Sequence, residues 1–454
     1  MNDGISPGSG LQAAVADRLD ALASWKVRYW APAVLGIMMM GDSWDVGIIG
    51  YVMPSMRHEW ALSTLQVGGI ISAGFAGQSI GALLFGPLAE RFGRIGVLTV
   101  AVTAMSLLSI ACALAPDPQL FTWLRFAQGV GFGGAVPVCV SYVNELAPTA
   151  TRGRYFSLFQ FLMVSGFALC GFVSAVVIPA FGWRWMFALS AFPVLCVPLI
   201  LFTLPESPRW LARLGRVDAT NRSLIKLGAP PLPATVAQAI EEKAPRVPIS
   251  ALFTPELRGI TLSTGGLWFL VSLVSYAFST WTPTLYVDVF HLKLDLALRY
   301  AAYTGIAYMM TPLVFALVLD RFGRRSTGIT VTAGALATLA LLVALGQSHP
   351  ASSVFLMAVG WTMSGSIFVL LWPYSGEVFP TKIRSTALGL CSAIARLGST
   401  VTPLAVAGTL SATGSIVAVF GVLAAALLIV LLLWLFGSRE MAGQRLDTLG
   451  DDHS

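Results

Sequence analysis

Charged side chains are scarce in this sequence. Asp, Glu, Lys and Arg make up 11% of its 454 residues, whereas hydrophobic residues make up 56%. A typical soluble domain carries about 25% charged residues, so this composition argues strongly against a water-soluble enzyme. It also excludes intrinsic disorder, which requires low hydrophobicity. At roughly 20 apolar residues per span, the chain has room for about a dozen transmembrane helices.

Histidine and cysteine are also rare, and neither residue forms a recognisable site. The five cysteines lie in apolar runs without CxxC spacing, and the four histidines lie in predicted loops or the tail. Small buried hydrophobic residues are the expected role for such cysteines. We therefore expect no metal site, no cofactor and no enzymatic centre. Because no basic stripe contains interleaved aromatic residues, we also expect no nucleic-acid partner.

Twelve apolar runs have the length of membrane helices, six on each side of a polar segment rich in Pro, Arg and Glu. The runs cover residues 30–54, 65–89, 96–114, 120–145, 155–180, 184–204, 259–287, 297–319, 326–346, 351–375, 383–410 and 414–436. The prediction is an all-α integral membrane protein with an N-tail (1–29), an N-terminal six-helix bundle (30–204), a middle loop (205–258), a C-terminal six-helix bundle (259–436) and a C-tail (437–454).

The distribution of basic residues predicts the orientation. Of the 28 Lys and Arg residues, 22 lie in the two tails, the middle loop and the short loops on the same side of the predicted spans. The opposite side holds four, namely Arg57, Arg184, Lys293 and Arg299. Because cytoplasmic loops are enriched in Lys and Arg, we expect both termini and the middle loop in the cytoplasm. The net charge of +6 is then a signal of topology.

Two motifs occur once in each half of the chain. GPLAERFGR at 86–94 matches LDRFGRR at 319–325 with an offset of 230 residues. NELAPTATR at 144–152 matches GEVFPTKIR at 376–384 with an offset of 232 residues. Two motifs that recur in the same order indicate a structural repeat, a common construction among secondary transporters.

The charged residues of these loops are candidates for a conformational latch, because ion pairs at helix ends can form in one state and break in another. Gly93 and Gly323 would allow the tight turns. The alternative is that the charges only anchor the loops at the membrane surface. The candidates are Glu90, Arg91, Arg94, Glu145, Arg152, Asp320, Arg321, Arg324, Glu377 and Arg384.

Together with RFAQGVGFGG (125–134) and PESPRWL (205–211), these motifs resemble the major facilitator superfamily over nearly the whole chain. The resemblance implies two pseudo-symmetric six-helix bundles around a central site, working by alternating access. The segment GDSWDVGIIG (41–50) is similar to the DGYDLGIIG-type signature of the aromatic acid:proton symporters, with Ser43 and Trp44 in place of Gly and Tyr.

Two further elements narrow the resemblance. YAFSTWTPTLY (276–286) is similar to the W-x-P-T element of the same symporters, and ARLGSTVTP (395–403) is similar to an Arg-x-Gly element shared with organic anion and organic cation carriers. The paired glutamines of the sugar porters are absent from the seventh span, which argues against hexoses despite the PESPRWL motif.

Four charged residues lie deep within the predicted spans: Asp42, Asp45, Arg125 and Arg396. A charge at that depth costs about 3 kcal/mol on insertion scales, so such residues are functional candidates. Asp42 and Asp45 share a helix face, and two nearby carboxylates cannot both ionise cheaply. One of them is placed to carry a proton; Asp45 is slightly favoured, and a structural hydrogen bond is the alternative.

The two arginines have different expected roles. Arg396 is the candidate for the substrate's charge, since a guanidinium offers a carboxylate two parallel hydrogen bonds; a structural ion pair is the alternative. The resemblance implies that Arg125 takes part in proton coupling by pairing with a first-span acid, although helix packing explains the adjacent glycines equally well.

Aromatic residues could stack on a flat ring in the central cavity. Trp44, Trp281, Tyr308 and Trp372 rank highest, because helices one, seven, eight and ten usually line the cavity in the fold that the resemblance implies. Tyr276 and, as a hydrogen-bonding residue, Gln160 complete the candidates. For any one aromatic residue the alternative is a place at the membrane interface or against lipid.

These observations predict a monomeric twelve-span secondary transporter of the inner membrane that imports a small organic anion, a benzoate-like or pyridine carboxylate, with a proton. One alternative is an organic cation or drug:proton antiporter, in which the first-span acids would meet the cation. Such exporters usually carry G-x-x-x-G-P in the fifth span, whereas this span reads SGFALCGFVSAVVIP, with no proline directly after the second glycine. A non-transporting nutrient sensor is the other alternative, and the short tails count against it.

Overall fold

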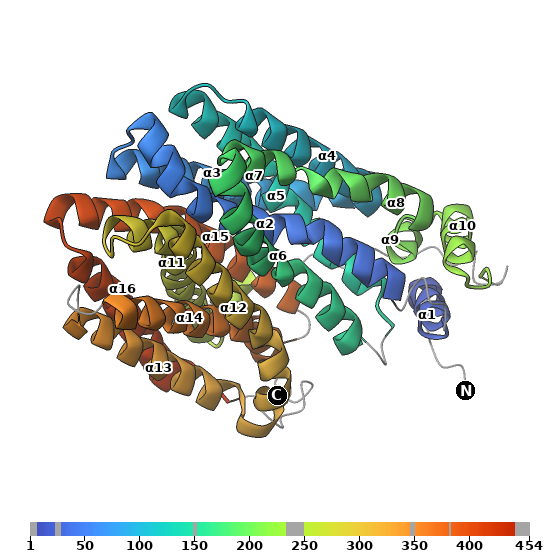
Figure 1. Ribbon diagram of the computed structural model, residues 1–454. Helices are drawn as coiled ribbons and strands as arrows, with labels where there is room; N and C mark the ends of the chain where they lie inside the picture. The colour runs from blue at the N-terminus through green and yellow to red at the C-terminus, as the bar shows by residue number, and fades with distance from the viewer. Residues whose placement is uncertain are drawn as a thin grey trace.

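The computed structural model describes residues 7–22, 29–148, 152–232, 249–345, 350–380 and 383–440, over which all regular secondary structure is helical (Figure 1). The N-terminal bundle consists of α2 (Ala31–Trp60), α3 (Thr64–Phe92), α4 (Arg94–Ala113), α5 (Pro118–Leu146), α6 (Arg152–Phe181), α7 (Arg184–Leu189), η3 (Phe192–Leu195) and α8 (Cys196–Thr203). The C-terminal bundle consists of α11 (Arg258–Asp288), α12 (Leu294–Phe322), α13 (Arg324–Leu345), α14 (Pro350–Val378), α15 (Arg384–Thr413), α16 (Ile416–Leu432) and η5 (Leu433–Gly437).

These helices confirm the predicted all-α membrane architecture. Within the described residues, eleven helical segments are long and apolar enough to cross a membrane, and α12, with 29 residues, provides the twelfth crossing. The sixth crossing is broken into α7, η3 and α8. Pro193 lies in the 3₁₀ turn between them, where a missing backbone N–H is tolerated. The five cysteines are buried and unpaired, as their apolar surroundings predict.

Local sequence signals explain where several of the helices begin and end. Ser63 and Gln66 form a reciprocal capping box at the start of α3, and Asp117 accepts from the backbone N–H of Leu120 at the start of α5. Gly93 and Gly323 adopt φ values of 97° and 81° between α3 and α4 and between α12 and α13. This left-handed conformation, which glycine tolerates, confirms the predicted tight turns.

Glycines bring the backbones of α3 and α5 into contact. A methyl group at Gly77 would overlap the carbonyl oxygen of Phe126, and one at Gly133 would overlap the carbonyl oxygen of Gln78. Small residues of this kind allow close helix packing in membranes. The contact fixes the position of Gln78 in the middle of α3 relative to α5.

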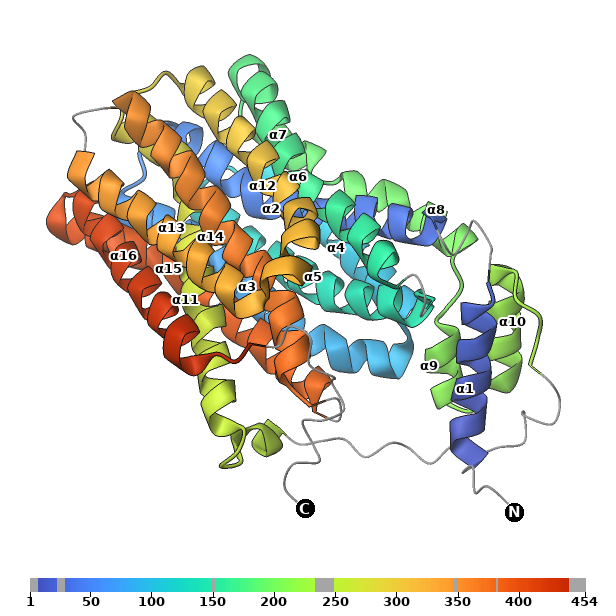
Figure 2. The ribbon, with the colours of Figure 1, turned by 90° about the horizontal axis from the view of Figure 1, so that it is seen from below.

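Three helices that the sequence did not predict lie together at one end of the N-terminal bundle (Figure 2). They are α1 (Pro7–Asp20), α9 (Pro208–Arg213) and α10 (Val217–Leu227). We call this end of the transmembrane helices the α9 end, and the opposite end the far end. Leu11, Val15 and Leu19 of α1 are at most 1% exposed. Their spacing of four residues gives α1 one apolar face, which packs on α9 in the same core cluster.

Among the described residues, the two bundles contact each other at mid-depth and towards the far end. The helix pairs are α2 with α11, α3 with α15, and α6 with α12. A methyl group at Gly50 would lie 2.9 Å from the carbonyl oxygens of Ser279 and Thr280. Arg57 at the end of α2 forms an ion pair with Asp288 at the end of α11. The two bundles are therefore closed against each other at the far end.

Candidate functional site

The deepest charge pair joins α2 to α5. Asp45 is fully buried, and its Oδ1 accepts a hydrogen bond of 2.5 Å from Nη1 of Arg125, which is 3% exposed. A buried carboxylate and guanidinium stabilise each other's charge only while both partners are present. The pair thus places a protonatable group against a fixed positive charge in the N-terminal bundle.

Neutral side chains extend this pair into a chain of hydrogen bonds. Arg125 Nη1 also donates to Gln128 Oε1 at 2.6 Å, and Gln128 Nε2 donates to Ser109 Oγ of α4 at 2.5 Å. The ring of Phe187 lies 5.5 Å from the guanidinium carbon of Arg125. Sequence reasoning missed Gln128. Its position one helical turn after Arg125 was the available signal.

Asp42 has surroundings different from those of Asp45, although the two acids are three residues apart. Asp42 is 8% exposed, and its Oδ1 has no hydrogen-bond partner among the described residues. It interacts electrostatically with Arg396 of the C-terminal bundle as well as with Asp45. Asp42 therefore belongs electrostatically to the boundary between the bundles, whereas Asp45 is held within the N-terminal bundle.

Arg396 reaches across that boundary from α15. Its Nη1 donates a hydrogen bond to Oε1 of Gln78 on α3, and Gln78 is 1% exposed. One residue further along α3, Ser79 Oγ lies 3.2 Å from Thr400 Oγ1 on α15. The candidate anion-binding arginine is thus held between both bundles at mid-depth.

Three of the predicted aromatic residues lie on helices that meet near this boundary. Tyr276 interacts electrostatically with Arg396 and Asp42, and its ring centroid is 5.0 Å from that of Phe75 on α3. Tyr308 stacks at 6.3 Å on Trp361. Trp372 is 38% exposed, so it offers the largest free aromatic surface of the set.

The contacts found for the other predicted binding residues are with parts of the molecule other than Arg396. Trp44 packs on Phe192 of its own bundle, with 5.9 Å between ring centroids. Trp281 is 1% exposed, within the core of the C-terminal bundle. Both indole N–H groups have no hydrogen-bond partner among the described residues. Gln160 is half-buried on α6.

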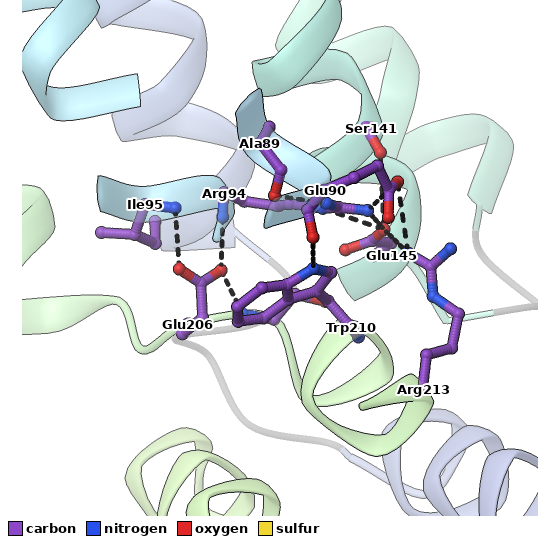
Figure 3. A network of polar contacts seen from close by, with 10 residues as sticks. Ala89, Glu90, Arg94, Ile95, Ser141, Glu145, Glu206, Trp210 and Arg213 are labelled. Carbon is purple, nitrogen blue, oxygen red and sulfur yellow. Dashed lines mark hydrogen bonds and ion pairs between the residues drawn. The ribbon is translucent and has the colours of Figure 1, made fainter. Parts of the chain in front are cut away.

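At the α9 end of the N-terminal bundle, the predicted latch residues form a network (Figure 3). Arg94 Nη2 donates to Glu90 at 2.6 Å and to Glu145 at 3.0 Å, and Arg213 of α9 reaches Glu145 at 3.1 Å. Glu206 accepts from the backbone N–H of Arg94 at 2.8 Å and closes the start of α4. Burial raises the pKa of Glu206, and these backbone hydrogen bonds partly oppose the rise.

The C-terminal bundle repeats the network. Arg324 Nη2 donates to Glu377 at 2.9 Å, and Glu440 accepts from the backbone N–H of Arg324 at 3.0 Å and of Arg325 at 3.1 Å. Glu206 and Glu440 are 234 residues apart, close to the offset of the two sequence motifs. The repeat therefore includes a third charged position, a helix-capping glutamate, that the motifs did not reveal.

The remaining latch candidates have other surroundings or lie outside the description. Arg91 is exposed over the ring of Phe92, and Arg384 donates to the carbonyl oxygen of Phe379. The side chains of Arg152, Asp320 and Arg321 lie outside the described residues. The ion pairs of Arg94, Arg213 and Arg324 each join residues of the same half of the chain, so they hold the internal arrangement of each bundle.

A cavity of about 710 Å³ lies elsewhere, between the far halves of α11, α12 and α14. It is lined by Tyr286, Tyr300, Tyr303, Phe355 and Met363 among other uncharged residues. A site for a charged ligand needs a partner for the charge, and this cavity offers none. The deep charges, rather than this cavity, therefore mark the candidate site.

Comparison with known proteins gives consistent matches. A family model described as "Sugar (and other) transporter" matches residues 30–451. The niacin transporter NiaP of Acinetobacter baylyi is 31% identical over 448 residues, which cover 96% of this chain and 99% of that protein. The gallate transporter of Pseudomonas putida is 33% identical over 375 residues, which cover 80% of this chain and 81% of that protein. The 4-hydroxybenzoate transporter PcaK of A. baylyi is 28% identical, with 82% of each chain covered.

Solved structures give the same fold. A crystal structure of a D-xylose-proton symporter superposes with a TM-score of 0.75 at 19% identity, covering 92% of this chain and 99% of that one. The partially occluded inward-open xylose transporter XylE from E. coli superposes with a TM-score of 0.74 at 21% identity, covering 91% of this chain and 98% of that one.

Proposed function

Because this chain belongs to the sugar (and other) transporter family of the major facilitator superfamily, it is a membrane transporter and not an enzyme, and we propose that it imports a small aromatic or pyridine carboxylate together with a proton. Alternating access of the two bundles carries the substrate across the membrane. The relatives are named for niacin, gallate and 4-hydroxybenzoate, each of which has a carboxylate on an aromatic ring.

The position of Arg396 is the observation that carries this proposal. Its guanidinium lies at mid-depth between the two bundles and is held by the neutral amide of Gln78. Guanidinium is permanently charged and can bind a carboxylate through two parallel hydrogen bonds. Tyr276 beside it, and Trp372 on α14, supply aromatic surface for the ring of the substrate.

The first-span acids supply the proton sites. Protonation of Asp45 would neutralise one partner of the buried pair with Arg125, and Gln128 would then hold the guanidinium. Since a buried charge without its partner is costly, the protonated and ionised forms of Asp45 favour different arrangements of α2 and α5. Proton binding is in this way linked to the packing of the N-terminal bundle, as coupling requires.

The orientation follows from the basic residues at the α9 end. We place this end, with both termini, in the cytoplasm and the far end outside the inner membrane. The contacts at the far end, including Arg57 with Asp288, then close the outer side, and the bundles rock as one monomer between outward- and inward-facing states.

A cation:proton antiporter is the second candidate, and Asp42 is the observation in its favour. Its Oδ1 has no hydrogen-bond partner among the described residues and could meet a cation. The neighbouring charge of Arg396 would repel the same cation. We therefore favour the carboxylate.

Two measurements on purified protein test the proposal. In proteoliposomes with an imposed proton gradient, Asp45→Asn should abolish uphill uptake of benzoate or nicotinate and leave exchange across the membrane. If this variant still concentrates substrate, Asp45 does not carry the coupling proton.

The second measurement tests the charge of the substrate. Arg396→Ala should remove thermal stabilisation by carboxylates, since hydrogen bonds to a charged group contribute about 1.5–3 kcal/mol, or roughly 10- to 100-fold in affinity. Arg299→Ala, at an exposed arginine of α12, is the matched control and should leave the stabilisation intact. Stabilisation of the unaltered protein by cations and not by carboxylates would overturn the proposal.

A further inference from the structure

We propose that Gln78 is a positioning residue of the carboxylate site: it orients the Arg396 guanidinium from the opposite bundle, so that the arginine binds an aromatic carboxylate only while the bundles are together at mid-depth. This inference rests on the proposed function, because it assumes that Arg396 meets the substrate. No feature of the amino-acid sequence singles out Gln78, a neutral residue within the apolar run 65–89.

The place of Gln78 is fixed by the backbone of its own bundle. A methyl group at Gly133 would overlap the backbone of Gln78, and one at Gly129 would lie 3.1 Å from its backbone nitrogen. No side chain separates α3 from α5 at these points. The backbone of Gln78 is therefore held by direct packing of two helices, and it presents the side-chain amide as an acceptor from the N-terminal bundle.

The backbone near Arg396 is packed against the C-terminal bundle in a similar way. Two residues along α15, a methyl group at Gly398 would lie 2.6 Å from the carbonyl oxygen of Phe269 on α11. The hydrogen bond between Arg396 and Gln78 thus joins two residues that are packed within different bundles. When the two bundles rock apart at mid-depth, the donor Arg396 and the acceptor Gln78 therefore separate.

The neutral amide has a chemical consequence. A carboxylate partner would satisfy the guanidinium and cancel its charge, whereas an amide oxygen accepts one hydrogen bond and leaves the charge in place. A guanidinium has five N–H donors, so donors remain for a substrate carboxylate after one is used on Gln78. Gln78 therefore orients the cation without itself adding a negative charge that would compete with an anion.

The geometry also makes the site dependent on the state of the transporter. A ligand shifts a conformational equilibrium only by the difference in its affinity for the two states. An arginine oriented by the opposite bundle binds carboxylate more tightly when that bundle is in contact. Carboxylate binding then favours the state in which α3 and α15 are together at mid-depth.

Two variants of similar size test the inference. Gln78→Glu keeps the acceptor and adds a negative charge that competes with the substrate for Arg396. Gln78→Met removes the acceptor. Affinity is measured by calorimetry for benzoate and benzamide, and for nicotinate and nicotinamide, so that each carboxylate is compared with its uncharged amide.

The preference for carboxylate over amide is the deciding quantity. We expect Gln78→Met to lower this preference about tenfold and Gln78→Glu about a hundredfold, the range of a hydrogen bond to a charged group. A purely structural role would weaken the carboxylate and the amide equally and leave the ratio unchanged. A ratio within twofold of the unaltered protein in both variants would overturn the inference.

Two controls isolate the effect. Ser79→Ala removes the neighbouring contact with Thr400 between the same helices and should leave the ratio within about twofold, because the hydrogen bond between Gln78 and Arg396 is kept. Gln119→Glu makes the same chemical change at an exposed position near the start of α5 and should also leave it unchanged. If the unaltered protein shows no preference for carboxylates, the proposed function fails; if it does and the Gln78 variants keep that preference, only this inference fails.

Discussion

The two bundles carry the same ion-pair network at the α9 end, but the N-terminal copy is more deeply covered. The Arg94 side chain is 2% exposed and that of its counterpart Arg324 is 16% exposed. Their partners Glu145 and Glu377 are 14% and 25% exposed. The additional cover comes from α9, which contributes Arg213 to the N-terminal network.

The deep charges are also divided unequally. The N-terminal bundle holds Asp42, Asp45 and Arg125, and the C-terminal bundle holds Arg396. Under the proposed function, the N-terminal half binds the proton and the C-terminal half binds the anion. A duplicated framework can therefore keep its shared network at one end while its two halves carry different charges at mid-depth.

Removing the central arginine of each network should give the largest difference between the bundles. Arg94→Ala leaves Glu145 partly buried without its main partner, and we expect a loss of about 3–5 kcal/mol in the free energy of unfolding. Arg324→Ala affects a more exposed pair and should cost about 1 kcal/mol. Thermal unfolding of the detergent-solubilised protein measures both.

Arg91→Ala is the control for this pair of variants. Arg91 belongs to the same motif but is exposed, so its removal should change stability by about 0.5 kcal/mol or less. Equal losses for Arg94→Ala and Arg324→Ala would show that the two networks contribute alike and that the additional burial has no energetic effect.

Much of the fold could be predicted because its signals are local or repeated. Twelve apolar runs predicted the helices, and the repeated motifs contain the charged residues that the structure pairs, Arg94 with Glu145 and Arg324 with Glu377. The first-span acid beside Arg125 followed from the resemblance, and the structure shows Asp45 as its partner.

The parts that sequence reasoning missed depend on tertiary packing. Gln78 and Gln128 are neutral residues in apolar helices, and only the approach of another helix gives them a charged partner. Glu206 belongs to the PESPRWL motif of the predicted middle loop, and only the fold brings it to the start of α4. The N-tail (1–29) carried no predicted helix, because the apolar face of α1 has only three leucine and valine residues at helical spacing.

Removing the contribution of α9 should make the N-terminal network more like the C-terminal one. Arg213→Ala removes the contact with Glu145, but Arg213 is 41% exposed, so solvent screens the pair. We expect a loss of about 0.5 kcal/mol, in the range of exposed ion pairs. In this background Arg94→Ala should still cost more than Arg324→Ala, because the ring of Trp210 on α9 still lies over Arg94. If the difference between those variants disappears, the cover by Arg213 alone explains the unequal stability.

The smallest expected effect is a pH dependence at Glu206. Burial raises the pKa of this glutamate above its ordinary value of 4.5, so the folded protein holds the proton more tightly than the unfolded chain does. The stabilising contribution of that proton is complete below the unfolded pKa and is lost as pH rises through the folded pKa. Glu206→Gln cannot titrate but keeps an oxygen that accepts from the backbone N–H of Arg94. Its thermal midpoint should therefore fall less than that of the unaltered protein between pH 4.5 and neutrality. Identical pH profiles for the two proteins would show that Glu206 does not titrate differently on folding.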